Sequence, residues 1–89
     1  MYEIKIGRKA EKNLKKLPVE VIQQLRLLTD DLRETGPVQT TWRNFSKLGP
    51  NKYHCHLNYH YVACWTNING TIQIEVYYVG SRENAPYRK

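Results

Sequence analysis

The chain has 89 residues and a mass of 10.6 kDa, and we expect a single small domain over residues 1–89. Hydrophobic residues make up 40% of it and charged residues 25%, which is the balance of a globular protein rather than a disordered one. Fourteen Lys and Arg against eight Asp and Glu give a formal net charge of +6. This charge favours acidic or polyanionic partners and argues against a protein that binds basic substrates.

Several classes of protein are excluded by the same composition. No apolar run approaches the roughly 18 residues that a membrane span needs, and residues 1–7 are too charged for a signal peptide. Cys55 and Cys64 form neither a CxxC motif nor a dense framework, so we expect reduced thiols and a cytoplasmic location. Secreted disulfide scaffolds, transmembrane proteins and multidomain enzymes do not fit.

The first half of the chain predicts one strand and two helices. Apolar and polar side chains alternate over residues 2–6, which is the period of a short half-buried strand. Residues 10–17 place three apolar side chains one turn apart and predict a helix that Pro18 ends. From Val19 onward, apolar positions recur at spacings of three and four, and the resulting amphipathic helix should end at Gly36.

The second half is β-rich. After a polar loop over residues 38–44, β-branched and aromatic residues are enriched in three segments, at residues 53–57, 61–65 and 71–79. Asn69 and Gly70 favour a type I′ turn, so the last two strands should be antiparallel neighbours. The predicted order is β-α-α-β-β-β, an α+β fold with a two-helix hairpin packed on one face of a small, mainly antiparallel sheet. The other face of the sheet would remain available.

Histidines are concentrated at the middle of this sheet. Strand periodicity puts His54 and His56 on one face and the apolar residues of the same segment on the other. The apolar set should turn toward the helices, so we expect the two histidines to point outward. His60 follows closely, so all three histidines of the chain lie within residues 54–60.

This cluster suits the cleavage of RNA without a metal. A neutral imidazole takes a proton from a ribose 2′-hydroxyl, and a second imidazolium protonates the leaving 5′-oxygen. Arg82, after the last predicted strand, supplies a guanidinium for the crowded phosphorane, and Tyr87 offers a hydroxyl to phosphate or a ring to a base. The predicted catalytic set is therefore His54, His56, His60, Arg82 and Tyr87.

Two other interpretations of the histidines stay open. They are either ordinary surface or hydrogen-bonded polar residues, or ligands of a zinc ion held by an HxH pair and a third histidine. Zinc is disfavoured because no carboxylate is close in sequence and because the cysteines fall on the wrong face or off the spacing. We expect no metal, and the scattered glycines form no phosphate loop that would indicate a nucleotide cofactor.

Cations of the predicted first helix and of the strand region are expected to bind RNA phosphates. These residues are Arg8, Lys9, Lys12, Lys15, Lys16, Lys47 and Lys52. The helical run is equally compatible with a solvated helix face.

The element order and several short motifs resemble the RelE/ParE toxin family of bacterial type II toxin–antitoxin modules. The motifs are Lys47-Leu48-Gly49, Tyr53-His54-Cys55-His56-Leu57, the strand at 61–65 and Tyr78-Val79-Gly80-Ser81-Arg82 followed by Tyr87. The resemblance covers nearly the whole chain. It implies a ribosome-dependent mRNA endoribonuclease (an mRNA interferase) that inhibits translation by 2′-hydroxyl attack and is itself inhibited by a cognate antitoxin.

The resemblance also assigns roles to residues. It places His54 and His56 where RelE-like toxins carry paired lysines, and it places Arg82 and Tyr87 at the late arginine and tyrosine of that family. The exchange of lysine for histidine resembles the YafQ branch, in which histidines and acidic residues supply the acid–base chemistry. Histidine needs almost no pKa shift to act as a base, whereas lysine needs a large one.

One position departs from the family pattern. The strand that usually reads Tyr-Arg has Tyr61-Val62 here, so that arginine is missing, and His60 is the nearest residue to replace it. Either His54 or His56 would then be the general base, with the other histidine or His60 as general acid.

Two alternative functions remain. A ParE-like protein poisons DNA gyrase through protein contacts, although such proteins generally lack the basic and histidine cluster. A non-catalytic RNA-binding module would bind RNA in a strongly salt-dependent way and leave it intact. In either toxin class the small core favours stabilisation by a partner, and an antitoxin segment bearing acidic residues would suit the grooves beside the two helices.

Overall fold

The computed structural model describes residues 1–87; the last two residues of the expected domain, Arg88 and Lys89, lie outside the described residues. Two short 3₁₀ segments, η1 (Ile68–Gly70) and η2 (Arg82–Asn84), accompany the helices and strands. The helices and strands are, in chain order, β1 (Glu3–Ile6), α1 (Arg8–Leu14), α2 (Val19–Thr35), β2 (Ser46–Gly49), β3 (Lys52–His56), β4 (Tyr61–Asn67) and β5 (Gln73–Ser81).

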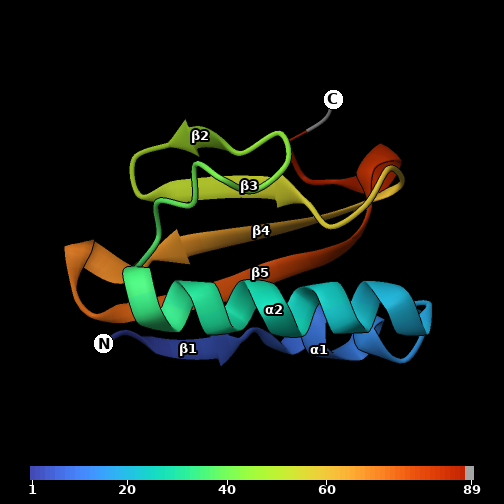
Figure 1. The fold of residues 1–89 in the computed structure, drawn as a ribbon, viewed down its shortest axis with the longest axis horizontal. Coiled ribbons are helices and arrows are strands. Elements are labelled where there is room, and N and C mark those ends of the chain that lie inside the picture. Colours follow the sequence, from blue (N-terminus) through green and yellow to red (C-terminus); the bar gives the residue numbers. More distant parts are fainter. Residues whose placement is uncertain (88–89) are drawn as a thin grey trace.

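The strands form one sheet in the order β1-β5-β4-β3-β2, and α2 runs along it (Figure 1). β1 pairs with β5 in parallel, and the remaining neighbours are antiparallel. The predicted α+β fold with a mainly antiparallel sheet is confirmed.

The hydrophobic core lies between the helices and one face of the sheet. Its largest fully buried side chain is Trp65, whose indole nitrogen donates a hydrogen bond of 2.9 Å to the Pro37 carbonyl. The buried residues of this cluster are Ala10, Val21, Leu25, Leu28 and Leu32 from the helices and Tyr53, Cys55, Leu57, Ala63, Trp65, Ile74, Val76 and Val79 from the sheet and its turn. The apolar positions of β3 therefore face the helices, as their alternation predicts.

β2 is a strand that the sequence pattern did not predict. It follows the polar loop and pairs with β3 through Ser46 opposite His54 and Lys47 opposite Tyr53. It lies at the edge of the sheet, and its first two residues are exposed. A short, exposed edge strand needs no apolar alternation, so periodicity gives no signal for it. The sheet has five strands where the sequence predicted four.

The hairpin between β4 and β5 is confirmed, but its loop is longer than two residues. Asn69 and Gly70 adopt the predicted positive φ angles, 51° and 70°. β4 extends to Asn67 and β5 begins at Gln73, so residues 68–72 form the connection. The side-chain amide of Asn67 donates to the carbonyls of Thr71 and Gln73, at 2.7 and 3.1 Å, and closes this loop.

The predicted bounds of the first helix were too long at its C-terminal end, because α1 ends at Leu14 rather than at residue 17. Within residues 1–87, no helix is both long enough and apolar enough to cross a membrane.

Candidate functional site

β3 presents His54 and His56 on the sheet face that is turned away from the helices. In the antiparallel register His54 is opposite Cys64 of β4 and His56 is opposite Val62. The intervening Cys55 belongs to the helix-side core. The predicted orientation of the two histidines is thus correct, but the expectation of an uncovered face is not: only 8% of His54 is exposed.

His54 is covered from two directions. The Ser46 hydroxyl on β2 lies 2.8 Å from its Nδ1. The ring of Tyr87 lies over it, with the two ring centroids 4.5 Å apart. The tail that carries Tyr87 is anchored by Ala85, which is 3% exposed. Residues from an edge strand and from the end of the chain therefore hold one histidine in place.

His56 is the more accessible of the pair. Its ring centroid is 5.7 Å from that of His54, and it lies within electrostatic reach of Arg82 and Arg43. The backbone brings Arg43 close, because the His56 amide donates a 2.8 Å hydrogen bond to the Arg43 carbonyl. Two guanidinium groups from different ends of the fold thus approach one imidazole.

Both of these histidines are shifted toward the neutral form. Burial and the neighbouring His56 lower the pKa of His54 below its ordinary value of 6.5, while hydrogen bonding with Ser46 opposes the shift. Burial, Arg82 and Arg43 lower the pKa of His56 in the same direction. Both shifts favour the neutral imidazole, which is the form that a general base requires.

Arg82 is positioned at the start of η2, directly after β5. Its amide donates a 2.8 Å hydrogen bond to the His60 carbonyl, and the Ser81 hydroxyl caps η2 by accepting from the Asn84 amide at 3.3 Å. The Arg82 guanidinium lies over the ring of Tyr59, 4.9 Å from its centroid. The side chain is thereby held between the β3–β4 turn and the histidine pair.

His60 occupies that turn and is exposed. Its ring contacts Tyr59, with centroids 5.0 Å apart, and its backbone carbonyl binds Arg82. His60 therefore belongs to the rim of the site through Tyr59 and Arg82, whereas His54 and His56 make its floor.

A hollow of about 550 Å³ opens beside His56. Its lining is mostly polar and comes from α2, from the loop before β2 and from the end of β3: Gln24, Thr41, Trp42, Arg43, Asn44, His56 and Leu57. The indole of Trp42 is fixed by a 2.8 Å hydrogen bond to the Asp31 carboxylate. Arg43 and His56 thus border a space large enough for part of a nucleotide.

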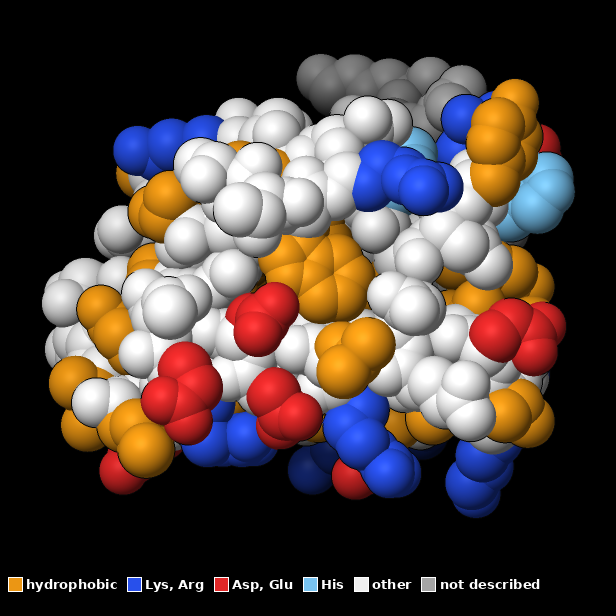
Figure 2. All heavy atoms as spheres, viewed as in Figure 1, with side chains coloured by type: hydrophobic (Ala, Val, Ile, Leu, Met, Phe, Trp, Pro, Cys, Tyr) orange, Lys and Arg blue, Asp and Glu red, His pale blue; other side chains and the backbone are white. Residues whose placement is uncertain are grey.

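The predicted RNA-binding cations are spread over different surfaces. Lys52 shares the face of β3 with His54 and His56, whereas Lys47 is paired with Tyr53 and belongs to the opposite face. Lys and Arg side chains lie along the edge where α1 and β1 are found and also at the opposite edge, beside the histidines (Figure 2). Of the α1-region cations, Lys16 lines a hollow with Ser81 and Asn84, near Arg82.

Two members of this site were not predicted from the sequence. Arg43 was assigned to a polar loop, and Ser46 was not considered because β2 was not expected. Of the two cysteines, Cys55 lies on the helix side, as expected, whereas Cys64 lies on the histidine face. Cys64 is buried beside Tyr77, and burial raises the pKa of its thiol to about 12. Among residues 1–87, no three His, Cys, Asp or Glu side chains are grouped to hold a metal ion.

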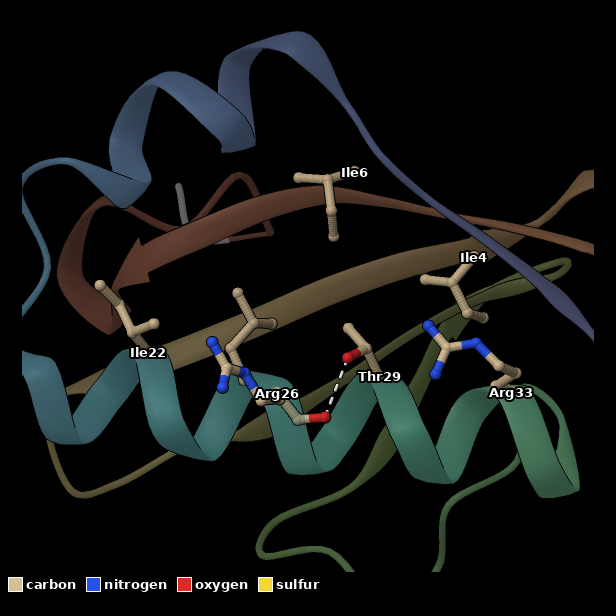
Figure 3. Close-up of a pocket in the computed structure, with 7 residues that line it drawn as sticks. Ile4, Ile6, Ile22, Arg26, Thr29 and Arg33 are labelled. Atoms are coloured by element: carbon tan, nitrogen blue, oxygen red, sulfur yellow. Dashed lines mark hydrogen bonds between the residues drawn. The ribbon is translucent and has the colours of Figure 1, made fainter.

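A second, apolar hollow of about 220 Å³ lies between α2 and the edge strand β1. Figure 3 shows Ile4 and Ile6 of β1 on one side of it and Ile22 of α2 on the other, toward the end away from Ile4, with the side chains of Arg26 and Arg33 at its rim. The Thr29 hydroxyl in the same hollow is satisfied by the Arg26 carbonyl at 2.9 Å. This surface, which we call the α2–β1 groove, combines an apolar floor with a cationic rim.

The fold matches solved structures of RelE-type toxins. The isolated E. coli RelE toxin superposes with a TM-score of 0.72 at 21% identity, covering 97% of this chain and 89% of that one. A chain of the intact E. coli RelBE toxin–antitoxin complex superposes with a TM-score of 0.75 at 22% identity, covering 94% of this chain and 100% of that one. A chain of the archaeal RelE–RelB complex from Pyrococcus horikoshii superposes with a TM-score of 0.73 at 17% identity, covering 94% of this chain and 98% of that one.

At these identities the likeness establishes the fold, and the resemblance expected from the sequence is confirmed at that level. No family model and no curated protein sequence matches the chain.

Proposed function

We propose that this chain is the toxin of a type II toxin–antitoxin module and that it cuts mRNA on the ribosome in the cytoplasm, without a metal. The RelE-type fold supports the toxin assignment. The observation that carries the nuclease assignment is the meeting of His56 with His54, Arg82 and Arg43 on the sheet face away from the helices.

In the proposed reaction His56 is the general base. Its neutral imidazole accepts the proton of a ribose 2′-hydroxyl, the 2′-oxygen forms a bond to the adjacent phosphorus, and the bond from phosphorus to the 5′-oxygen breaks. The leaving 5′-oxygen takes a proton from the general acid. The products are a 2′,3′-cyclic phosphate and a 5′-hydroxyl end, so atoms and charge balance.

The other residues of the site have separate roles in this proposal. Arg82 and Arg43 bind the phosphate and stabilise the additional charge of the phosphorane. His60 is the candidate general acid, because it lies on the solvent-exposed rim and its carbonyl binds the amide of Arg82, which would hold the phosphate. His54, held by Ser46 and packed beneath Tyr87, supports His56 from below the surface that the RNA would contact.

The basic residues extend this surface. Lys52 lies on the same face as the catalytic histidines and would contact the mRNA backbone. The cations of α1 lie on another element, and we assign them to ribosomal RNA phosphates.

The assignment is tested with purified protein and ribosomes programmed with mRNA. His56→Ala and Arg82→Ala should each reduce the single-turnover cleavage rate by about 10²-fold or more. Ile72→Ala serves as the control, because Ile72 is 54% exposed in the loop at the far end of the β4–β5 hairpin. Wild-type cleavage by His54→Ala, His56→Ala, His60→Ala and Arg82→Ala alike would refute the proposed site.

The same preparation separates the alternatives. A gyrase poison would leave the mRNA intact and block DNA supercoiling, and a non-catalytic RNA-binding protein would bind programmed ribosomes without cutting the message.

We further propose that the α2–β1 groove receives the antitoxin. Two of the three matched structures described above are chains of toxin–antitoxin complexes. The isoleucine floor suits the apolar side of an antitoxin segment, and Arg26 and Arg33 would pair with its acidic residues.

The partner to test is the product of a small gene adjacent to this one. Ile22→Glu and Arg33→Glu should weaken its binding at least tenfold, measured by calorimetry with the folded proteins. Leu27→Glu is the matched control, since Leu27 is 53% exposed on α2 and does not line the groove. Equal effects of Ile22→Glu and Leu27→Glu would contradict this assignment.

A further inference from the structure

Tyr59 differs from the other described tyrosines in that most of its surface is exposed to solvent. It is 65% exposed, whereas Tyr2, Tyr53 and Tyr61 pack in or against the core. The Tyr78 hydroxyl, by comparison, donates to the Ser81 carbonyl at 2.7 Å. An aromatic side chain of this size contributes little to stability when its surface stays in water.

The turn that carries Tyr59 is rigid. The side-chain oxygen of Asn58 accepts hydrogen bonds from the amides of His60 and Tyr61, at 2.8 and 2.9 Å. The Leu57 amide also donates to the Tyr61 carbonyl at 2.8 Å, which closes the base of the turn. The backbone that carries the ring is therefore already ordered by hydrogen bonds. A ligand that binds the ring then costs little additional conformational entropy in this turn.

The neighbours of the ring connect it to the proposed phosphate site. The Arg82 guanidinium covers part of it, 4.9 Å from the centroid, and His60 touches it edge-on at 5.0 Å. A phosphate bound by Arg82 therefore lies next to this ring. In single-stranded RNA, the nucleotide next to a bound phosphate carries its base within reach of such a surface, and unpaired bases stack on aromatic rings regardless of sequence.

We propose that Tyr59 is a stacking platform for a nucleobase that flanks the scissile phosphate in single-stranded mRNA. This rests on the proposed function in that Arg82 is taken to bind the phosphate. The guanidinium occupies one side of the ring and the base takes the other, so that Arg82 and Tyr59 together fix the direction in which the message crosses the histidine floor.

The binding experiment uses ribosomes programmed with mRNA that has 2′-deoxyribose at every nucleotide of the A-site codon and therefore cannot be cut by 2′-hydroxyl attack. The protein is labelled at Met1, which is 83% exposed, and its Kd is measured by anisotropy. Tyr59→Phe should bind like the wild type, and Tyr59→Leu about tenfold more weakly. Ile72→Ala, the matched loss of an exposed apolar side chain, should have no effect.

An abasic message distinguishes stacking from a mere effect on Arg82. The base is removed at each codon position in turn. At one position its removal should weaken binding of the wild type to the programmed ribosome. At that position binding of Tyr59→Leu should not change, because the variant has already lost the contact. If the binding free energy lost by removing the base and that lost by Tyr59→Leu add fully at every position, Tyr59 does not stack a base and the inference is wrong.

The outcome is separable from that of the proposed function. Coupling between Tyr59 and one base, in a protein that fails to cut an all-ribose message, supports the platform and refutes the nuclease. Cleavage of the all-ribose message without coupling refutes the platform alone. Failure of the wild type to bind the programmed ribosome refutes both.

Discussion

The Ser46 hydroxyl lies 2.8 Å from Nδ1 of His54, across a registered pair of β2 and β3. This contact engages one nitrogen of the ring, so any proton that His54 exchanges with its surroundings must pass through Nε2. The ring is also packed beneath Tyr87. An edge strand therefore sets the orientation of a histidine in the proposed site.

Replacing Ser46 tests the value of this contact. Ser46→Ala removes the hydroxyl from a nitrogen that is mostly shielded from water, and we expect the free energy of unfolding to fall by about 1 kcal/mol. The single-turnover cleavage rate should fall up to about tenfold, with little change in half-saturation, because His54 positions His56 rather than the message. Ser46→Thr keeps the hydroxyl in a strand-compatible residue and should restore both the free energy of unfolding and the cleavage rate. A Thr variant as impaired as the Ala variant would contradict the positioning of His54 by the Ser46 hydroxyl.

The lowered pKa values make the stability of the fold depend on pH. At pH values between the folded-state pKa of His54 and the ordinary value of 6.5, the unfolded chain binds a proton that the folded chain does not. Stability due to this group is therefore fully present above pH 6.5 and is lost as pH falls through that window. Urea unfolding of the wild type and of His54→Gln, measured from pH 5 to pH 8, should give a smaller pH dependence for the variant. Identical slopes would show that burial of His54 is not coupled to its protonation.

Arg43 should control the protonation of His56. The pKa of His56 is lowered by burial and then by Arg82 and Arg43, so Arg43→Gln removes one repulsive charge and should raise that pKa. NMR titration of the imidazole gives the shift directly. With His56 as the base, the acid limb of the cleavage profile should move to higher pH by the same amount. Arg33→Gln, on the opposite side of α2 in the α2–β1 groove, is the control. It should change neither the pKa of His56 nor the pH profile of cleavage.

The sequence predicted those parts of the fold that depend on periodicity. Spacings of three and four locate α2, and alternation in β3 correctly turns Tyr53 and Cys55 toward the helices and His54 away from them. These patterns are reliable because each reflects a face that must leave water.

The parts that the sequence did not predict depend on long-range contacts. Ser46 reaches His54 only through an edge strand without an apolar pattern, and Arg43 reaches His56 only through one backbone hydrogen bond. Tyr87 covers His54 from 33 positions further along the chain, so the shielding of that histidine is invisible in the spacing of β3 alone.

Gly36, which ends α2, provides the sharpest test of the fold itself. Its φ of 94° lies outside the range of ordinary side chains, and a Cβ there would come within 2.8 Å of the Tyr2 ring. Gly36→Ala should therefore lower the free energy of unfolding by about 1–3 kcal/mol, measured by urea denaturation. Gly49→Ala is the control, because a Cβ at Gly49 meets nothing within 4 Å and its φ is not positive, and it should change stability by less than about 0.5 kcal/mol. In a Tyr2→Ala background, Gly36→Ala should lower the free energy of unfolding by less than it does in the wild type, because the clash with the Tyr2 ring is gone and only the backbone strain remains. Equal stabilities of the Gly36 and Gly49 variants would show that the turn after α2 adapts freely.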